Sequence, residues 1–374
     1  MKKLLVVAQS LGGGGTEVAM IEFLNHLNST HYDTTLLLID DNEEYKYRLK
    51  QNIKIKHIKF DSTFYKKLAS TNFVEGKVLK KLKINKYADL YRMIAKHASK
   101  LDEYFDVGID FYGYGSFTTA YLALNVDAKR KAFWIHDQHM PWIVNVSRYF
   151  KYYDTIFGVS KAIINSFNSL YPAEQIKSKI IYNVIDTREI IRKSKEFLPQ
   201  EFSNEVFKIV TVGRLTEQKG YDIAIDAANE LKKKKIPFIW YVIGDGRDKN
   251  KLHHLVENKN LHSKFILLGR KNNPYPYIKN CDLYVQPSRH EGYGLAVLEA
   301  RTLKKPIIVS DLPAFREQIK DKENGIISKL SPSELAKNIE KMYFNKSLRF
   351  RCATSSSKVN FDDEIKKFDQ FSNS

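Results

Sequence analysis

Two series of short apolar runs, separated by polar or helix-like stretches, constrain the fold of this chain more than any other feature. The runs cover residues 4–8, 35–39, 53–60, 107–112, 132–135 and 156–159, and then 209–212, 238–243, 265–268, 283–285, 307–309 and 325–327. Strands that alternate with helices form mostly parallel sheets. A chain of 374 residues is long enough for two such domains with separate cores. The sequence therefore predicts an α/β protein with two doubly wound domains.

The domain boundary is expected in the charged stretch 187–204, which follows the apolar residues 181–185. We take residues 1–190 as the N-terminal domain and residues 191–350 as the C-terminal domain. Residues 351–374 are expected to form a helix that packs back on the first domain.

Cysteine usage and hydropathy set the outer limits. The two cysteines, Cys281 and Cys352, have no metal-ligand spacing and suggest no disulfide framework. The apolar run at residues 4–8 is too short for a signal peptide and leads into a glycine loop. No run approaches the roughly 18 apolar residues that indicate a membrane span. We therefore expect a cytoplasmic protein.

The positive charge is concentrated in one segment. Residues 46–100 hold sixteen Lys or Arg against three acids, whereas the whole chain has a net charge of +18. Aromatic and apolar residues interrupt these bases, which suits the anionic inner leaflet of a membrane. Nucleic acid is a competing partner, and a solvated lysine-rich face is the plain alternative. Peripheral contact with the cell membrane is thus one option for this segment, and we expect no nucleic acid.

Two carboxylates bracket a glycine loop in the second half of the chain. Glu291 and Glu299 flank Gly292, Tyr293, Gly294 and Leu295, which lie between an apolar strand and a helix-like segment. Unpaired backbone N–H groups and the helix dipole make such a loop an anion site. Glu299, in the second helical turn, would reach hydroxyls on a ligand whose phosphates lie at the helix start. The alternative is that Glu291 caps the helix and Glu299 is solvated.

This segment resembles the E-x7-E signature of the retaining, nucleotide-sugar-dependent glycosyltransferases of family 4. The resemblance implies the GT-B fold, in which two Rossmann-like domains face a central cleft and the N-terminal domain lies on the acceptor side. It implies that Glu291 contacts the donor sugar and acts in catalysis. It also implies that the loop residues Gly292, Tyr293, Gly294 and Leu295 hold the diphosphate, and that Glu299 binds the ribose.

A second segment, G-R-L-T-E-Q-K-G at residues 213–220, follows a strand and resembles the diphosphate-binding loop of the same family. The resemblance assigns Arg214 and Lys219 to the donor diphosphate. The sequence contains no Asp-x-Asp motif, so fixed cations and helix N-termini would neutralise the leaving group, and neither a metal nor another cofactor is expected. The resemblance also implies that the nucleotide lies near Gly244, Asp245, Gly246 and Arg270, which follow the next two strands.

Two features of the first half complete the candidate site. The loop with Gly13, Gly14, Gly15 and Glu17 resembles the G-G-x-E loop of the family, and flexible filler is its alternative. His136 ends a strand, and in relatives a His at a comparable position contacts the donor sugar near the reacting carbon. We therefore take His136 as a second catalytic candidate, although a lone His is more often structural.

Three functions are compatible with these features. The first is a retaining glycosyltransferase that moves a hexose or N-acetylhexosamine from a nucleoside-diphosphate sugar, with a UDP-sugar favoured over a GDP-sugar. Its acceptor would be a glycan or a lipid-linked saccharide in capsule or cell-wall polysaccharide synthesis. The second is a nucleotide-sugar epimerase of the same fold, which needs no acceptor. The third is a basic protein without enzymatic activity, which would not explain the paired carboxylates.

Overall fold

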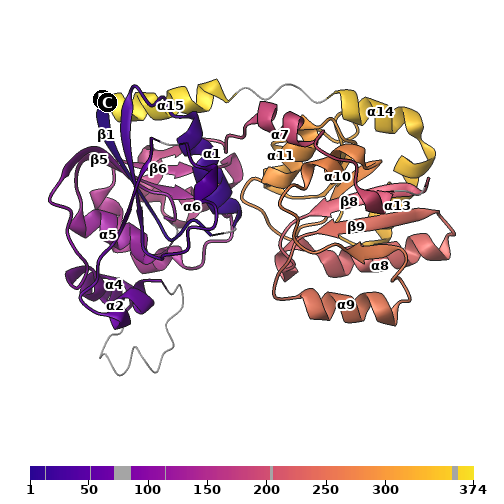
Figure 1. Ribbon diagram of the computed structural model, residues 1–374, viewed down its shortest axis with the longest axis horizontal. Coiled ribbons are helices and arrows are strands. Elements are labelled where there is room, and N and C mark those ends of the chain that lie inside the picture. Colours follow the sequence, from indigo (N-terminus) through magenta and orange to yellow (C-terminus); the bar gives the residue numbers. More distant parts are fainter. Residues whose placement is uncertain (13, 51, 71–85, 114, 203–204, 356–360) are drawn as a thin grey trace. The chain divides into compact units, whose positions relative to one another are not determined.

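The computed structural model describes residues 1–12, 14–50, 52–70, 86–113, 115–202, 205–355 and 361–374. The chain divides into two compact units. The first consists of Met1–Ile185 and Phe361–Ser374, and the second is Asp186–Asn360. Each unit is a sheet covered by helices (Figure 1). None of the described helices is both long and apolar enough to cross a membrane.

The first unit contains a seven-stranded parallel sheet in the order β3-β2-β1-β4-β5-β6-β7. Its strands are β1 (Lys2–Ala8), β2 (Tyr32–Leu38), β3 (Lys54–His57), β4 (Tyr104–Asp110), β5 (Asp127–Ile135), β6 (Thr155–Gly158) and β7 (Ser178–Ile180). The central strand β1 is fully buried from Leu4 to Ala8, as expected for a parallel sheet covered on both faces.

The helices of the first unit are α1 (Gly15–His26), α2 (Thr63–Ala69), α4 (Tyr87–Lys96), α5 (Phe117–Asn125), α6 (Lys161–Leu170) and α15 (Asp362–Asn373). Short 3-10 segments are η1 (Lys46–Arg48), η2 (Ile143–Tyr152) and η3 (Pro172–Lys177). The C-terminal helix α15 lies beside α1 (Figure 1), where the rings of Phe368 and Phe23 meet edge to face with centroids 5.0 Å apart. The last helix of the chain thus completes the core of the first unit.

The second unit contains a six-stranded parallel sheet in the order β10-β9-β8-β11-β12-β13. Its strands are β8 (Phe207–Val212), β9 (Phe238–Ile243), β10 (Phe265–Leu267), β11 (Leu283–Gln286), β12 (Ile307–Ser310) and β13 (Ile326–Ser328). The sheet order reverses between β8 and β11, and ligands bind at such a switch point in open α/β sheets.

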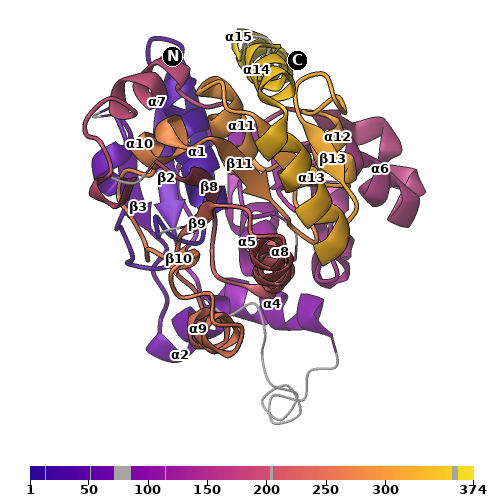
Figure 2. The ribbon, with the colours of Figure 1, turned by 90° about the vertical axis from the view of Figure 1, so that its right-hand side faces the viewer.

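Helices cover both faces of this sheet. They are α7 (Thr187–Lys193), α8 (Tyr221–Lys233), α9 (Lys249–Asn258), α10 (Tyr275–Asn280), α11 (Leu295–Thr302), α12 (Pro313–Arg316), α13 (Pro332–Phe344) and α14 (Lys346–Thr354), with 3-10 segments η4 (Gln200–Phe202) and η5 (Glu217–Lys219). One core joins the sheet to α8, α9 and α13, and the other joins it to α10, α11 and α12. Figure 2 looks along α8, with α13 next to it.

Each predicted apolar run overlaps a strand, but the limits of the domains differ from those expected. The second unit begins at Asp186, five residues before the expected start at residue 191. The reason is local: the Asp186 side chain accepts a hydrogen bond from the backbone N–H of Glu189 and so caps α7, which packs on α10 and α11. Residues 351–354 belong to α14 of the second unit, because Leu348 and Cys352 lie in its core.

Candidate active site

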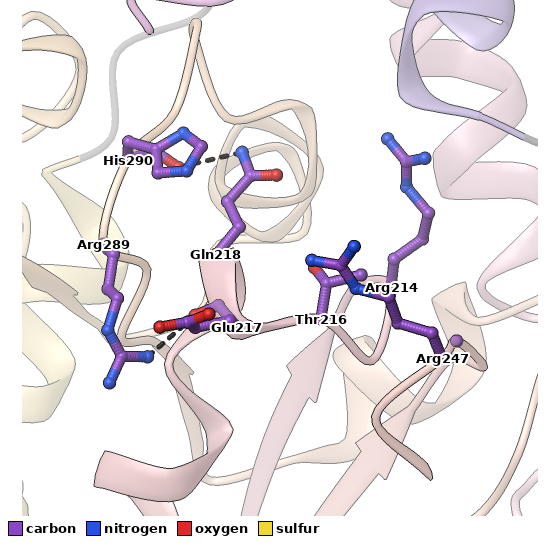
Figure 3. Close-up of a pocket in the computed structure, with 8 residues that line it drawn as sticks. Arg214, Thr216, Glu217, Gln218, Arg247, Arg289 and His290 are labelled. Atoms are coloured by element: carbon purple, nitrogen blue, oxygen red, sulfur yellow. Dashed lines mark hydrogen bonds between the residues drawn. The ribbon is translucent and has the colours of Figure 1, made fainter. Parts of the chain in front are cut away.

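Two loops meet at the switch point of the second sheet. The first follows β8 and contains Arg214 and Lys219, and the second follows β11 and contains Glu291. Since β8 and β11 are neighbours, their carboxyl ends bring the loops together. The backbone N–H of Arg289 donates to the carbonyl of Gln218 over 2.7 Å, and the Gln218 side chain donates to the carbonyl of His290 over 3.0 Å (Figure 3).

Arg289 fixes this arrangement further. Its guanidinium donates two hydrogen bonds to the carboxylate of Asp222, of 2.8 and 2.7 Å, and a third to the carbonyl of Glu217. The Arg289 guanidinium holds the pKa of Asp222 below its usual value. Gly220 adopts φ +68°, and a Cβ at this position would lie 2.0 Å from the carbonyl oxygen of Pro287. Only glycine therefore permits this approach of the loops.

The structure brings the two oppositely charged candidates into direct contact. Lys219 Nζ donates to Glu291 Oε1 over 2.7 Å, and the two side chains are 18% and 8% exposed. Ser288 Oγ donates to the same carboxylate oxygen over 2.7 Å. The capping alternative for Glu291 is wrong, because the N-cap residue of α11 is Gly294. Glu291, the candidate for binding the sugar, and Lys219, the candidate for binding the diphosphate, thus form one partly buried ion pair.

The start of α11 has the features expected of an anion site. Gly294 adopts φ +89°, and a Cβ there would lie 2.5 Å from the Phe315 ring. The N-cap residue of this helix is thus a glycine, which has no side chain to cap the helix. The first N–H groups of α11, beginning at Leu295, have no intrahelical acceptor. Gly292 and Tyr293 are buried, and the Tyr293 carbonyl accepts from Gln318.

Glu299 lies in the second turn of α11, as predicted. It is half-buried, and one carboxylate oxygen accepts a hydrogen bond of 3.1 Å from Tyr275 OH. It is therefore no fully solvated helix residue. Tyr275 was missed by the sequence reasoning, since only the fold brings the start of α10 beside α11.

The predicted nucleotide turn packs against the first loop. The carbonyl of Asp245 accepts from Leu215 N–H over 2.9 Å. A Cβ on Gly244 would lie 1.9 Å from the Gly213 oxygen, and one on Gly246 would lie 2.5 Å from the Leu215 oxygen. Both glycines are thus required for close packing of the turn. Arg270 is exposed and follows β10.

A pocket of about 680 Å³ opens beside these loops. It is lined by Arg214, Thr216, Glu217, Gln218, Gly246, Arg247, Arg289 and His290. In Figure 3, Arg214 and Arg247 lie on one side of the pocket, and Arg289 and His290 lie on the other. Because Arg289 is paired with Asp222, Arg214 and Arg247 are the guanidinium groups of this pocket that suit an anionic ligand. Arg247 was not predicted, because its place at the pocket depends on the fold of the turn.

The first unit places its candidates at the carboxyl ends of β1 and β5, the two strands on either side of β4. His136 follows β5, and its ring lies 4.6 Å from that of Phe111. The ring atom Nε2 is buried and has no hydrogen-bond partner within the described parts of the chain. Burial lowers the pKa of His136 to about 3, against a hydrogen bond with the Phe111 backbone that raises it. The imidazole is therefore neutral at physiological pH.

The glycine loop lies at the end of β1, next to β4. Gly13 is outside the described residues, whereas Gly14 precedes α1 and Gly15 is its first residue. Glu17 is buried and accepts a hydrogen bond from Tyr112 OH. A Cβ on Gly14 would lie 2.1 Å from Glu17 Oε2, so the carboxylate covers the glycine backbone. A side chain at position 14 would therefore require the Glu17 carboxylate to move.

Residues 193–359 match the family of group 1 glycosyl transferases. The O-antigen biosynthesis glycosyltransferase WclY of Escherichia coli is 32% identical over 168 residues, or 44% of this chain and 46% of that protein. Such matches span about half the length of these relatives. An N-acetylgalactosaminyltransferase of Campylobacter jejuni, whose name specifies a diphospho-undecaprenol acceptor, is 26% identical over 87% of this chain and 86% of its own length.

The fold comparison covers both units. The Anabaena protein HepE, in complex with UDP and glucose, matches with a TM-score of 0.75 at 17% identity and covers all of both chains. This likeness concerns the fold alone. The second unit therefore belongs to the group 1 glycosyl transferases, and the chain as a whole has the GT-B fold of glycosyltransferases.

Proposed function

We propose that this protein is a retaining glycosyltransferase that moves a hexose or N-acetylhexosamine from a UDP-sugar to a glycan or lipid-linked saccharide in surface polysaccharide synthesis. The contact between Lys219 and Glu291 carries the proposal, because it joins a diphosphate-binding cation to a sugar-binding carboxylate. The UDP and glucose named with HepE, and the O-antigen role named for WclY, support it. A GDP-sugar is the second donor class to test.

In the proposed reaction, the bond between C1 of the sugar and the diphosphate oxygen breaks while the acceptor hydroxyl oxygen bonds to C1 on the same face. The acceptor proton passes to the leaving diphosphate. Arg214, Lys219 and the start of α11 would bind the diphosphate charge, so no metal is required. Glu291 would orient the sugar and Glu299 the ribose, while neutral His136 would contact the sugar near C1.

A lipid-linked acceptor implies contact with the membrane, and we propose that residues 46–100 provide it. In α4 the bases Arg92 and Lys96 are exposed, as are Lys59 and Lys100. Five other bases are paired with acids outside the segment: Lys46 with Glu43, Arg48 with Glu22, Lys54 with Asp33, Lys56 with Glu103, and Lys66 with Asp41. These pairs reduce the local excess of positive charge. Residues 71–85 of the segment lie outside the described parts of the chain. The exposed bases of α4 are therefore the ones to test.

The proposal is tested by a transfer assay with UDP- and GDP-sugars, run with a saccharide acceptor and with excess EDTA. Transfer should persist in EDTA, and Glu291→Ala should lower turnover by about 100-fold or more through loss of sugar orientation. Arg214→Ala should also slow turnover, whereas Lys233→Ala, at an exposed site on α8, is the matched control. Epimerised nucleotide sugar without transfer would favour the epimerase. Activity that returns only with Mn²⁺ or Mg²⁺ would contradict the charge assignment.

A further inference from the structure

Three polar side chains occupy alternate positions along β11 and its extension. Tyr284, Gln286 and Ser288 are each at most 1% exposed. Alternate residues of a strand point to the same face, so the three side chains follow one another along one side of the sheet. Burial of polar groups is costly unless their hydrogen bonds are satisfied.

The three side chains form a single hydrogen-bond chain. Tyr284 OH donates to Gln286 Oε1 over 2.8 Å, and Gln286 Nε2 donates to Ser288 Oγ over 3.0 Å. Ser288 Oγ then donates to Glu291 Oε1 over 2.7 Å. Because Ser288 accepts one bond, its single proton is available for the carboxylate. The direction of the chain is thus fixed from the phenol to Glu291.

The far end of this chain, the Tyr284 hydroxyl, is influenced by both candidate carboxylates. Burial raises the pKa of Tyr284 well above its usual value, and the Glu299 carboxylate and then Tyr221 raise it further, with a smaller effect from Glu291. The phenol therefore remains protonated and keeps its role as donor. Both carboxylates of the E-x7-E pair act on this one buried hydroxyl.

The two oxygens of Glu291 have different surroundings. Oε1 accepts from both Lys219 and Ser288, at 2.7 Å each. Among the described residues, no hydrogen-bond donor binds Oε2. The network thus fixes Oε1 of Glu291 and leaves Oε2 available to a ligand.

Stability alone gives no reason for this network. The neighbouring strand β12 fills the corresponding layer with Ile307 and Val309, which pair with Tyr284 and Gln286 and are fully buried and apolar. A buried polar chain is no more stable than such packing, but it fixes the orientation of the group that it contacts. That group is Glu291.

We propose that Ser288, Gln286 and Tyr284 are positioning residues for sugar transfer: their chain fixes Oε1 of Glu291 and directs Oε2 to a hydroxyl of the donor sugar. This inference rests on the proposed function and extends it to residues that do not touch the donor.

The experiment measures kcat and KM for the most active UDP-sugar, together with the Kd for UDP and the melting temperature. Ser288→Ala should lower kcat/KM by about 10- to 100-fold, the equivalent of one hydrogen bond to a charged group. UDP lacks the sugar, so its Kd should stay unchanged. Ser288→Thr, which keeps the hydroxyl, should recover most of the activity. Tyr284→Phe removes only a hydroxyl and should give a smaller loss of about 3- to 10-fold.

Two controls match these variants. Tyr241 is a buried tyrosine of the same sheet whose OH donates to the Glu201 carbonyl, so Tyr241→Phe should leave kcat/KM unchanged. Ser328 is buried in β13 and contacts neither carboxylate, so Ser328→Ala should do the same. Ser288→Ala added to Glu291→Gln should cause no further loss, because both changes act on the same contact.

Failure of this inference is distinct from failure of the proposed function. Wild-type kcat/KM in Ser288→Ala, with Glu291→Gln impaired, would overturn the positioning role and leave the function intact. The positioning role would also be overturned if Ser288→Ala lowered UDP affinity and melting temperature together with kcat/KM, since such a general loss indicates a merely structural role. Full activity of Glu291→Gln would contradict the proposed site itself.

Discussion

Burial changes the ionisation of the His136 imidazole. It lowers the pKa of the ring to about 3, and the ring centroid lies 4.6 Å from that of Phe111. In the proposed function, a sugar hydroxyl would therefore meet a neutral ring. Its buried Nε2 carries a hydrogen-bonding capacity that no described residue satisfies.

This burial predicts a pH dependence of stability. The folded-state pKa lies below the unfolded value of about 6.5, so the stabilisation is complete above that value and is lost as the pH falls toward 3. Relative to His136→Phe, the wild-type protein should lose up to about 1.4 kcal/mol per pH unit in this window. Urea unfolding at pH 7, 5.5 and 4 measures the difference. His139→Phe, at an exposed position, is the control, and parallel pH curves for wild type and His136→Phe would contradict the prediction.

At the scale of one element, the end of α11 has an unfavourable backbone conformation. Glycine is typical where a helix ends in the left-handed region, but Lys304 takes φ +53° there. The N–H of Lys305 still donates to the carbonyl of Ala300 over 3.1 Å, which is the usual hydrogen bond after a left-handed cap. The cap residue, however, is a lysine where glycine is typical. The lysine remains compatible with the cap only at an energetic cost.

Lys304→Gly should therefore raise the free energy of unfolding of the second unit by about 1 kcal/mol. The measurement is the urea concentration at the midpoint of unfolding of the second unit, which is recognised as the transition that added UDP shifts. Lys305→Gly is the matched change at a position without positive φ, and it should give no gain. Equal effects of the two substitutions would show that the left-handed conformation is not the cause.

The elements also show what the sequence could and could not predict. Apolar runs located the strands because parallel sheets bury both faces, but Ser178 to Ile180 formed an edge strand without such a run. The loops with Arg214 and Glu291 were predicted at strand ends, and the fold brings those ends together. The Arg289–Asp222 pair was missed, because these two residues lie far apart in the sequence and meet only through tertiary packing. The chain through Ser288 is local, and the alternation of Tyr284, Gln286 and Ser288 was a signal that could have indicated it.

For the whole molecule, the proposed acceptor predicts binding to anionic membranes. Flotation with phosphatidylglycerol vesicles should recover more protein than flotation with neutral vesicles, and recovery should fall as salt rises. Replacing Arg92, Lys96 and Lys100 by Gln should reduce recovery, because each exposed base contributes about 1 kcal/mol near such a surface. Lys54→Gln, at a site already paired with Asp33, is the control. Equal recovery on both kinds of vesicle would rule out this surface as a membrane contact.

The return of α15 to the first unit has a consequence for how the protein is made. Phe368 of α15 is buried against Phe23 near the start of the chain, and Phe371 is buried against Phe157. On the ribosome, this helix emerges only after the entire second unit has been synthesised. Until then, part of the apolar core of the first unit remains exposed to solvent. A premature stop within the second unit would therefore also leave the N-terminal unit without α15.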